Sequence, residues 1–321
     1  MQELFSRREV RPLDVIVVGN LNIDITAFIE APPPPDSEVE AHIFNISFGG
    51  SAANLATALS KLSCKVGLVA HIGSDELGKT ALMELKREGV YTSYIHIEKG
   101  QTTGFVVVIV ERSGVKRMIA FRGANSFLSS RSLPLRAARR TYIVHASSVK
   151  PSIANGIASK ALKGKAIFTY DPGGAAIKYK FKDFQPVLEK TKILFLNKTE
   201  AESLTSESDP RRVADLLLDY VPVVVVKLGA QGVYASYEGE DIHVPAFEVD
   251  MVIDTTGAGD AFNAGFLKGL LLNLPLRECC LLGNAVAAMK ITAPGARGGL
   301  PTLQQLSEFL RSRGVIIEKL P

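Results

Sequence analysis

The residues best suited to chemistry lie in the segment DTTGAGDAF, residues 254–262. A strand-like alternating pattern over residues 247–254 precedes the two glycines Gly257 and Gly259, and an apolar segment with helical character follows over residues 261–272. A Gly-x-Gly turn at a helix start lets successive backbone N–H groups converge on an anion, and the helix dipole adds to the attraction. A P-loop would place a lysine after such a turn, whereas this segment places Asp260. Taken alone, the pattern fits either an anion site beside a carboxylate or a tight turn followed by an ordinary helix-start acid.

These residues need a rigid sheet to hold them, and six short apolar runs indicate buried strands. The runs are Asp14–Asn20, Lys65–Ala70, Thr141–Ala146, Ala166–Tyr170, Lys192–Asn197 and Val223–Lys227. Runs that are apolar at nearly every position are typical of strands buried on both faces of a parallel sheet. Helical patterns alternate with them, as in residues 51–62, where alanines and leucines fall on one stripe. We therefore expect a doubly wound α/β fold with a mostly parallel sheet.

Two segments break this alternation. Residues 27–48 contain four consecutive prolines and two short extended stretches, and residues 102–121 form a β-hairpin pattern with ERSG at the turn. We expect a small antiparallel β-sheet, a lid, over residues 25–48 and 102–121. The large α/β domain would then comprise residues 1–24, 49–101 and 122–321. Such a lid has an apolar face that needs cover, either from the active site or from another subunit.

The composition narrows the class of protein. The net charge of +4, from 37 basic and 33 acidic residues, comes without a dense basic tract, so nucleic acid is a poor candidate partner. The N-terminal segment MQELFSRREVRP lacks the apolar core of a signal peptide, and no apolar run approaches the roughly 18 residues that span a bilayer. Three cysteines show no metal-binding or redox spacing, and the pair Cys279–Cys280 lies in an apolar helical run. We expect a cytoplasmic protein with no membrane partner and with these cysteines packed in its core.

The segment DTTGAGDAFNAGF resembles the second signature of the ribokinase-like (PfkB) carbohydrate kinase family. The stretch FGGSAANLATALSKL followed by VGLVAHIGSDELG resembles the first signature. The segments GNLNIDI, RGAN, NKTE, KLGAQG and APGARGGLP fall in the order that the family has. The resemblance runs from about residue 14 to about residue 301, nearly the whole chain. It implies a ribokinase-like fold in which the large domain binds the nucleotide and carries out catalysis.

The resemblance also implies a reaction and its catalytic residues. The chain would transfer the γ-phosphoryl group of ATP to a hydroxyl, with Asp260 accepting the hydroxyl proton. The N–H groups of Gly257, Ala258 and Gly259 would form an anion hole for the transferring group. Glu200, in the N-x-x-E motif that Asn197 begins, would hold Mg²⁺ through water.

The remaining family positions imply binding roles. Acceptor-binding residues would be Asn22, Asp24, Gly49, Gly50, Asn54, Arg122 and Asn125. Nucleotide-binding residues would be Asn197, Lys227, Gly229, Gly232 and Asn284. Asp254 and Thr256, with backbone near Ala293 and Gly298, would form the site for a monovalent cation such as K⁺ that many members have. Ordinary strand ends, helix caps or packing explain several of these polar residues equally well.

Some positions depart from the family pattern. The segment YDPGGA keeps the Asp-Pro of the family but has Gly173 where asparagine often follows. Arg122 stands where several ribose-specific members have a small residue or proline. Together with Lys116 and Arg117 on the lid, it would face either a phosphorylated or acidic acceptor or simply the solvent.

The acceptor therefore stays open at the level of sequence. Ribose or a related pentose is favoured, and the alternatives are a nucleoside, fructose 6-phosphate or a ribose phosphate. A binding protein that kept the fold without catalysis is a further alternative, which the intact Asp260 and Glu200 oppose. A dinucleotide oxidoreductase would need a G-x-G-x-x-G turn after the first strand, and GNLNID does not supply it. The family resemblance implies a homodimer joined through the lids.

Overall fold

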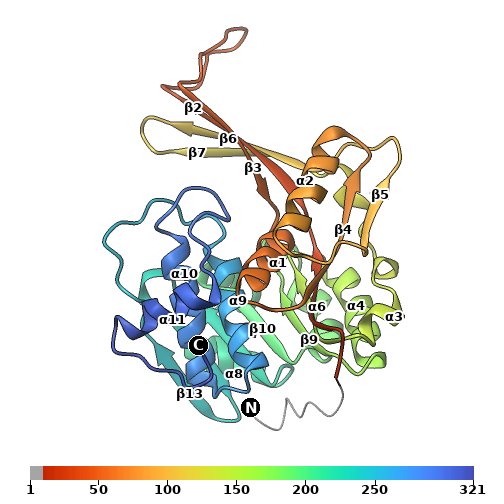
Figure 1. Cartoon of the computed structure of the whole chain (residues 1–321), viewed down its shortest axis with the longest axis vertical. Helices are drawn as coiled ribbons and strands as arrows, with labels where there is room; N and C mark the ends of the chain where they lie inside the picture. The colour runs from red at the N-terminus through yellow and green to blue at the C-terminus, as the bar shows by residue number, and fades with distance from the viewer. Residues whose placement is uncertain (1–9) are drawn as a thin grey trace.

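The computed structural model describes residues 10–321, and most of the charged segment discussed above, residues 1–9, lies outside the described part. Figure 1 shows a layered α/β body from which a small sheet projects. The main sheet has nine strands in the order β13-β12-β11-β10-β9-β8-β1-β4-β5. The strands are β1 (Leu13–Gly19), β4 (Val66–Gly73), β5 (Ile95–Glu98), β8 (Thr141–Ser147), β9 (Ile167–Asp171), β10 (Ile193–Asn197), β11 (Val223–Lys227), β12 (Val233–Tyr237) and β13 (Glu240–Val244).

The strands from β11 to β5 are parallel, whereas β12 pairs antiparallel with β11 on one side and with the edge strand β13 on the other. All six apolar runs form strands of this sheet, so the mostly parallel architecture is confirmed. Alternate residues of β1 serve two different cores: Val15 and Val17 pack in one, whereas Ile16 and Val18 pack in the other. This division follows from the two-residue period of a strand, and it makes the sheet doubly wound.

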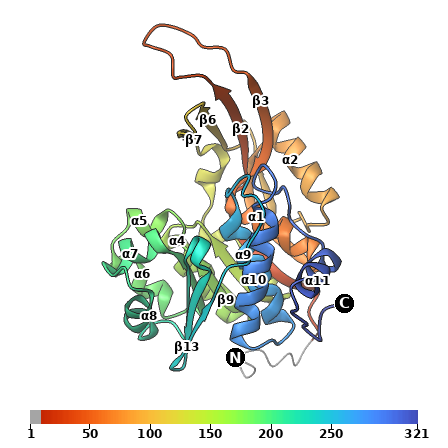
Figure 2. The ribbon, with the colours of Figure 1, turned by 90° about the vertical axis from the view of Figure 1, so that its left-hand side faces the viewer.

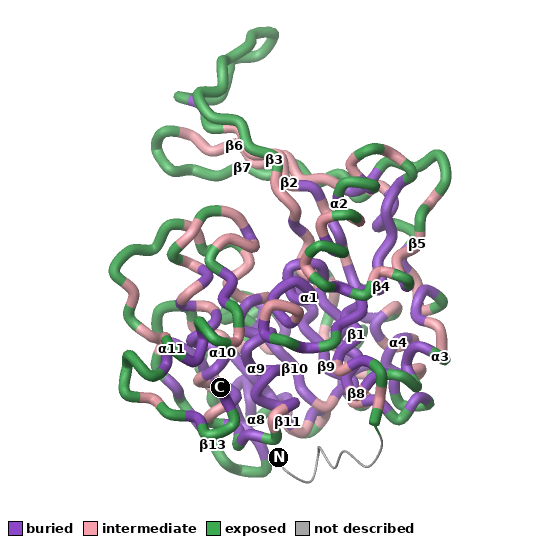
Figure 3. Tube along the Cα trace, viewed as in Figure 1, coloured by how far each residue is buried: buried purple, intermediate pink, exposed green. Residues whose placement is uncertain are grey.

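Helices cover both faces of the sheet, as Figure 2 shows from the side. The helices are α1 (Ser51–Lys61), α2 (Glu76–Arg87), α3 (Leu135–Ala138), α4 (Pro151–Lys163), α5 (Ala175–Lys178), α6 (Phe181–Leu188), α7 (Lys198–Thr205), α8 (Pro210–Leu218), α9 (Ala258–Leu271), α10 (Leu276–Lys290) and α11 (Leu303–Arg311), with short 3₁₀ turns η2 (Gly123–Phe127), η3 (Ser130–Ser132) and η4 (Gly229–Gln231). The buried segments in Figure 3 concentrate in the central strands and in α1, α9 and α10. Cys279 and Cys280 are free thiols buried in α10, as expected.

The second sheet is mixed rather than purely antiparallel, which corrects the expectation for the lid. Its order is β3 (Ile43–Gly49), β2 (Asn22–Ile29), β6 (Phe105–Glu111) and β7 (Lys116–Phe121). The pairs β2–β3 and β6–β7 are antiparallel hairpins, but the central pair β2–β6 is parallel. The reason is topological, because β2 and β6 both enter the small sheet from the large body and therefore run in the same direction.

Residues 247–254 do not form the strand that their alternating pattern indicates. The edge strand β13 ends at Val244, and Pro245 has no N–H with which to continue its ladder. The N–H groups of Ile253 and Asp254 instead donate to the carbonyl of Ile291, just beyond the end of α10 (2.8 and 3.2 Å). This contact brings the segment before the DTTGAGD turn against the C-terminus of α10.

One face of the small sheet presents apolar side chains to solvent. Residues paired across neighbouring strands point to the same face, which places Ile46, Ile25, Val107 and Ile119 in one row. On this face Phe44, Ile46, Ile119 and Phe121 are exposed. We call these four residues the lid patch. In the described residues no helix is both long enough and apolar enough to cross a membrane.

Candidate active site

The DTTGAGD turn is positioned by Gly257, which begins α9. Gly257 adopts φ 78°, and a Cβ there would lie 2.5 Å from the carbonyl oxygen of Ala296, so only glycine fits this left-handed position. The N–H of Ala258 donates to the Thr255 carbonyl (3.1 Å). The amides of Gly259 and Asp260 lie in the first helical turn, where a helix supplies no carbonyl partners. The helix therefore begins with donors available to an anion.

Asp260 lies in this first turn and is fixed by α1. Asn54 Nδ2 donates to Asp260 Oδ2 at 3.0 Å. Burial raises the pKa of Asp260 to about 7; Asp171 adds to the rise, whereas the Asn54 hydrogen bond, Lys227 and Arg297 oppose it. An aspartate at a helix start ordinarily has a low pKa and is a weak base, whereas a carboxyl group with a pKa near 7 can accept a proton near neutral pH.

Arg297, in the APGARGGLP segment, is a site residue that the sequence patterns did not single out. Its Nε donates to Asn54 Oδ1 (3.1 Å), and its Nη1 pairs with Glu84 Oε2 on α2 (2.5 Å). Because Asn54 in turn donates to Asp260, the guanidinium fixes the orientation of the amide that holds the carboxylate. The arginine is well buried, so these contacts are shielded from water.

Asp24 lies near the start of β2, in the small sheet. Burial raises the pKa of Asp24 to about 6, and the Arg297 guanidinium opposes the rise. A Cβ at residue 49 would lie 2.1 Å from Asp24 Oδ2, so Gly49 is needed to leave room for this carboxylate. Gly50, at φ 90°, precedes α1 and would clash with the Asn20 carbonyl if it carried a side chain. Both glycines therefore serve the protein's own packing, in addition to any approach to a ligand.

Asn22, the first residue of β2, and Asn125, in η2, are in contact where the small sheet begins. Asn125 Nδ2 donates to Asn22 Oδ1 (2.8 Å) and to the Leu21 carbonyl, and its Oδ1 accepts from the Leu21 N–H. Asn125 is thus engaged by the backbone at the start of β2, a positioning role, whereas Asn22 keeps its amide nitrogen for other partners. Arg122, at the start of η2, has an exposed side chain.

The centre of the parallel sheet's carboxyl edge carries an ion pair. Lys227, at the end of β11, donates through Nζ to Asp171 Oδ2 (2.7 Å), and Asn263 Nδ2 donates to the same oxygen (2.7 Å). Burial would raise the pKa of Asp171, but Lys227 and the hydrogen bonds hold the pKa below its usual range. A Cβ on Gly259 would lie 3.4 Å from Lys227 Nζ, so the ammonium sits directly behind the anion-binding turn.

Asn197 and Glu200 form a capping box at the start of α7. Asn197 Oδ1 accepts from the Glu200 N–H (2.8 Å), and Glu200 Oε2 accepts from the Asn197 N–H (2.9 Å). Burial raises the pKa of Glu200 to about 7; the nearby Asp171 adds to the rise and Lys227 opposes it. Glu200 therefore belongs to the same group of charges as Asp171 and Lys227, which the sequence separates widely.

The residues expected along the nucleotide lie around the β11–β12 turn. Gly229 begins η4 and Gly232 follows it, with φ 62° and 89°, and a Cβ on Gly232 would lie 2.1 Å from the Val244 carbonyl oxygen. Asn284 donates to the carbonyls of Val244 and Pro245 (3.0 and 2.9 Å). Its amide nitrogen thus anchors the end of β13 to α10, which leaves its carbonyl oxygen for a ligand.

Asp254 and Thr256, the residues expected at a monovalent-cation site, are hydrogen-bonded to each other. Asp254 Oδ1 accepts from the N–H and the Oγ1 of Thr256 (3.0 and 2.7 Å), and Oδ2 accepts from the Gly295 N–H (3.0 Å). These hydrogen bonds outweigh burial and lower the pKa of Asp254 to about 2. Lys116, from the small sheet, lies 3.6 Å from Asp254, whereas its neighbour Arg117 pairs with Glu111. The two basic side chains of the lid, Lys116 and Arg117, therefore each form an ion pair with a carboxylate of this chain.

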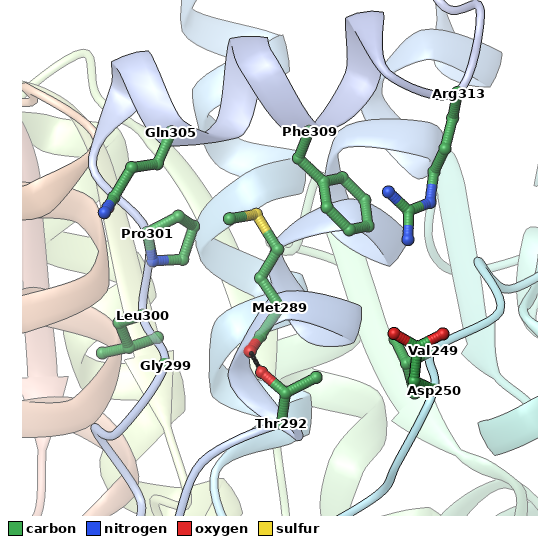
Figure 4. A pocket seen from close by; sticks show the side chains of 10 residues that line it. All are labelled: Val249, Asp250, Met289, Thr292, Gly299, Leu300, Pro301, Gln305, Phe309 and Arg313. Carbon is green, nitrogen blue, oxygen red and sulfur yellow. Dashed lines mark hydrogen bonds between the residues drawn. The ribbon is translucent and has the colours of Figure 1, made fainter.

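Two other features lie apart from this group. The pocket in Figure 4, of about 310 Å³, is lined by Met289, Phe309 and Arg313 among others, and none of the expected catalytic residues contributes to it. His71 links Glu98 and Ser132 through hydrogen bonds of 2.7 Å each, a spacing that resembles a hydrolytic triad. Ser132 is only 3% exposed and its Oγ also accepts from the Ser129 N–H, so this cluster ties η3 to β4 and β5.

The arrangement as a whole combines donors for an anion with a proton acceptor. The first turn of α9 offers N–H groups, the Lys227 ammonium lies close to Gly259 in that turn, and the Asp260 carboxylate belongs to the same turn. Such a site can stabilise a negatively charged group in transfer while a carboxylate accepts a proton from the attacking hydroxyl.

Comparison with known proteins places this geometry in context. The family model described as pfkB family carbohydrate kinase matches residues 13–303. The chain is 31% identical over 303 residues to a ribokinase of Haemophilus influenzae, covering 92% of this chain and 97% of the relative. It is also 31% identical over 300 residues to an ATP-dependent ribose-1-phosphate kinase of Halopiger xanaduensis, covering 93% of this chain and 98% of the relative.

Solved structures agree with the sequence comparisons. The structure of Arabidopsis thaliana ribokinase complexed with ribose and ATP superposes with a TM-score of 0.85 at 26% identity, covering 93% of this chain and 99% of that one.

Proposed function

The chain belongs to the pfkB family of carbohydrate kinases, and from this premise we propose that it phosphorylates a hydroxyl of ribose or a related pentose. The observation that carries the proposal is the contact between Asn54 and Asp260 at the first turn of α9. Asn54 occupies Oδ2, so we assign Oδ1 to the acceptor hydroxyl, whose proton it takes as the hydroxyl oxygen attacks the γ-phosphorus of ATP. The bond from that phosphorus to the bridging oxygen breaks, and ADP leaves.

The backbone and Lys227 would stabilise the charge of the transferring group. The amides of Gly257, Ala258 and Gly259 form the anion hole in this proposal, with the Ala258 amide leaving its turn partner Thr255 as it engages the phosphoryl oxygens. Lys227 remains behind the turn as a fixed positive charge. Such preorganised groups act without the reorganisation that water would need.

Mg²⁺ would neutralise phosphate charge, and the Glu200 and Asp171 carboxylates suit its preference for oxygen. Among residues 10–321 no group of three or more His, Cys, Asp or Glu side chains is arranged to bind a metal directly. The proposal has the ion held by Glu200 through water beside the phosphates. The proposal assigns the nucleotide to the edge formed by Asn197, Gly229, Gly232 and the carbonyl oxygen of Asn284.

The acceptor would lie between Asp24 and Asp260. Asp24 and the free amide of Asn22 supply an acceptor and a donor for sugar hydroxyls on β2. A phosphorylated pentose is the second candidate, because the exposed guanidinium of Arg122 could pair with a phosphate and the Arg122 backbone lies close to Asn22, on the other side of Gly104. A nucleoside or fructose 6-phosphate is less well supported, because no side-chain contact described above favours either.

The small sheet would act as a lid over the acceptor, separate from the large domain formed by residues 1–24, 49–101 and 122–321. We infer that the lid patch is buried in a homodimer, since an apolar face of this kind marks an interaction surface. The three cysteines are buried and show no disulfide-scaffold pattern, which suits a reducing compartment, and we assign the protein to the cytoplasm.

A coupled assay of ADP release tests the proposal. The purified protein is mixed with ATP, Mg²⁺ and, in separate reactions, ribose, deoxyribose, ribose 1-phosphate, ribose 5-phosphate, adenosine, fructose 6-phosphate and 2-keto-3-deoxygluconate. We expect the highest kcat/KM with ribose or another pentose. Higher kcat/KM with ribose 1-phosphate would establish the second candidate, and tight ligand binding without turnover would refute the kinase function.

A further inference from the structure

A fully buried lysine lies beneath the anion-binding turn. Lys290 is the last residue of α10, has 0% of its surface exposed, and donates through Nζ to the Asp254 carbonyl oxygen at 2.6 Å. Lysine is almost never fully buried unless it is paired. Burial lowers the pKa of Lys290, and the Asp254 carboxylate opposes that effect. The charge is therefore held where Asp254 can balance it, three residues before Gly257.

The oxygen atoms that would receive a monovalent cation already have donors. A K⁺ ion needs a ring of carbonyl and carboxylate oxygens that are free to replace its water. Here the Asp254 carbonyl binds Lys290, and both carboxylate oxygens of Asp254 accept from Thr256 and Gly295. Lys116 adds a second ammonium 3.6 Å from the same carboxylate. These residues do not fit a K⁺ site.

We propose that the Lys290 ammonium takes the place of a monovalent cation beneath the anion-binding turn, so that this chain works independently of K⁺. The inference rests on the proposed phosphoryl transfer. An ammonium group is close to K⁺ in size and carries the same charge, and it orients the Asp254 carbonyl as a cation would. Because it is covalently attached, it supports the amides of residues 257–259 at any salt composition.

Initial rates of ADP release provide the first test. The wild type is assayed with its preferred acceptor in KCl and in choline chloride at equal ionic strength, and we expect rates that agree within twofold. In Lys290→Met the charge-assisted hydrogen bond is lost, and we expect kcat/KM for ATP to fall by about tenfold in choline chloride. KCl or NH₄Cl should restore much of this loss, because a free ion can then enter the vacated space.

Lys160→Met is the matched control. Like Lys290, Lys160 donates to backbone carbonyl oxygens. It lies on α4, and its Nζ donates to the carbonyls of Ser130 and Leu133 (2.7 and 2.9 Å). The control should show no dependence on K⁺. If Lys290→Met keeps wild-type kcat/KM, or if its loss is not relieved by K⁺ or NH₄⁺, the inference is refuted.

A binding measurement tests the same inference without turnover. Tl⁺ replaces K⁺ in oxygen sites and is followed by ²⁰⁵Tl NMR with the full chain. We expect no saturable Tl⁺ binding to the wild type and saturable binding to Lys290→Met. Saturable binding to the wild type, or a rise of wild-type rate above threefold in K⁺, would overturn the inference even where the variant fails to fold. Absence of turnover with every acceptor would instead refute the proposed function and leave this binding test intact.

Discussion

At the scale of single residues, the site depends on carboxylates whose environments differ sharply. Asp260 and Asp24 are buried with raised pKa values, about 7 and 6. Asp254 and Asp171 are held below the usual range by hydrogen bonds or a lysine. Groups whose pKa values are separated in this way can take different roles at one pH. In the proposed function the raised pair, Asp260 and Asp24, would face the acceptor; in the lowered pair, Asp254 accepts hydrogen bonds from Thr256 and Gly295, and Asp171 accepts one from Lys227.

Replacing Asp260 by asparagine tests the proton acceptor. Asp260→Asn keeps the size and the Asn54 neighbour but cannot take a proton, so we expect kcat to fall by about 10²–10⁴-fold. Nucleotide affinity, measured by calorimetry with a non-hydrolysable ATP analogue, should stay within about threefold. A variant that retains more than about a tenth of the wild-type kcat would exclude Asp260 from this role.

The raised pKa of Asp260 also sets a pH dependence. The carboxylate must be ionised to accept a proton, so kcat should fall as the pH drops through about 7. The same group destabilises the fold as it ionises: its pKa is above the unfolded value of 3.8, so its stabilising effect declines as pH rises from 3.8 to about 7. Asp260→Asn should therefore have a higher Tm than the wild type at pH 8, with the difference shrinking toward pH 4. An unchanged or lower Tm at pH 8 would contradict the raised pKa.

Replacing Asp24 by alanine tests the acceptor side. Asp24→Ala removes a carboxylate that would accept hydrogen bonds from sugar hydroxyls, and it leaves the first turn of α9 untouched. Hydrogen bonds to charged groups contribute about 1.5–3 kcal/mol, so we expect KM for the sugar to rise by at least about tenfold. KM for ATP should change by less than about threefold. Equal rises in both constants would place Asp24 outside the acceptor site.

At the scale of elements, Arg297 connects three parts of the chain that carry the site. It joins the loop after α10 to Asn54 on α1 and to Glu84 on α2, and through Asn54 it reaches the start of α9. A local change at this residue should therefore alter the relation between helices rather than a single bond.

Arg297→Gln tests this positioning role. The Asn54 amide loses the partner that orients it, and we expect kcat to fall by about tenfold or more, as for other charge-assisted hydrogen bonds. Because Arg297 opposes the rise in the Asp260 pKa, its removal should move the acid limb of the kcat–pH profile to higher pH. Arg313→Gln, whose guanidinium stacks on Phe309 at 3.7 Å, is the control and should change neither quantity. A fall in kcat without a shift of the acid limb would indicate a purely structural role.

At the scale of the whole molecule, the small sheet has two faces with different tasks. One face carries Asp24 and Lys116, which reach the large body, and the other carries the lid patch. Since alternate residues of a strand point to opposite faces, the same four strands can cover an acceptor and present an apolar surface to a partner.

The dimer can be tested by charging the lid patch. Ile46→Lys places a charge in the middle of the patch, where Ile46 is 58% exposed, and we expect sedimentation to change from dimer to monomer. Ile177→Lys, at an apolar residue of α5 that is 57% exposed, is the matched control and should leave the dimer intact. A wild type that sediments as a monomer at micromolar concentration would refute the lid-patch dimer.

The sequence by itself determined the elements and the local chemistry of the turn. Continuous apolar runs specify strands buried on both faces. The glycine at residue 257 permits the positive φ with which the chain enters α9. These features depend on periodicity and backbone geometry within a few residues. For the same reason, the alternating pattern of residues 247–254 misled: nothing local shows that Ile253 and Asp254 donate to Ile291 and not to a neighbouring strand.

Only the tertiary structure decided how the site is held together. Arg297 lies 243 residues from Asn54, and Lys227 lies 56 residues from Asp171, so neither pairing appears in a local pattern. The parallel contact of β2 with β6 likewise depends on where both strands leave the large body. Lys290 shows the difference most clearly. In the sequence it is one charged residue at the end of a helix, and only the fold buries its ammonium against the Asp254 carbonyl, where a charge must find a partner because water is excluded.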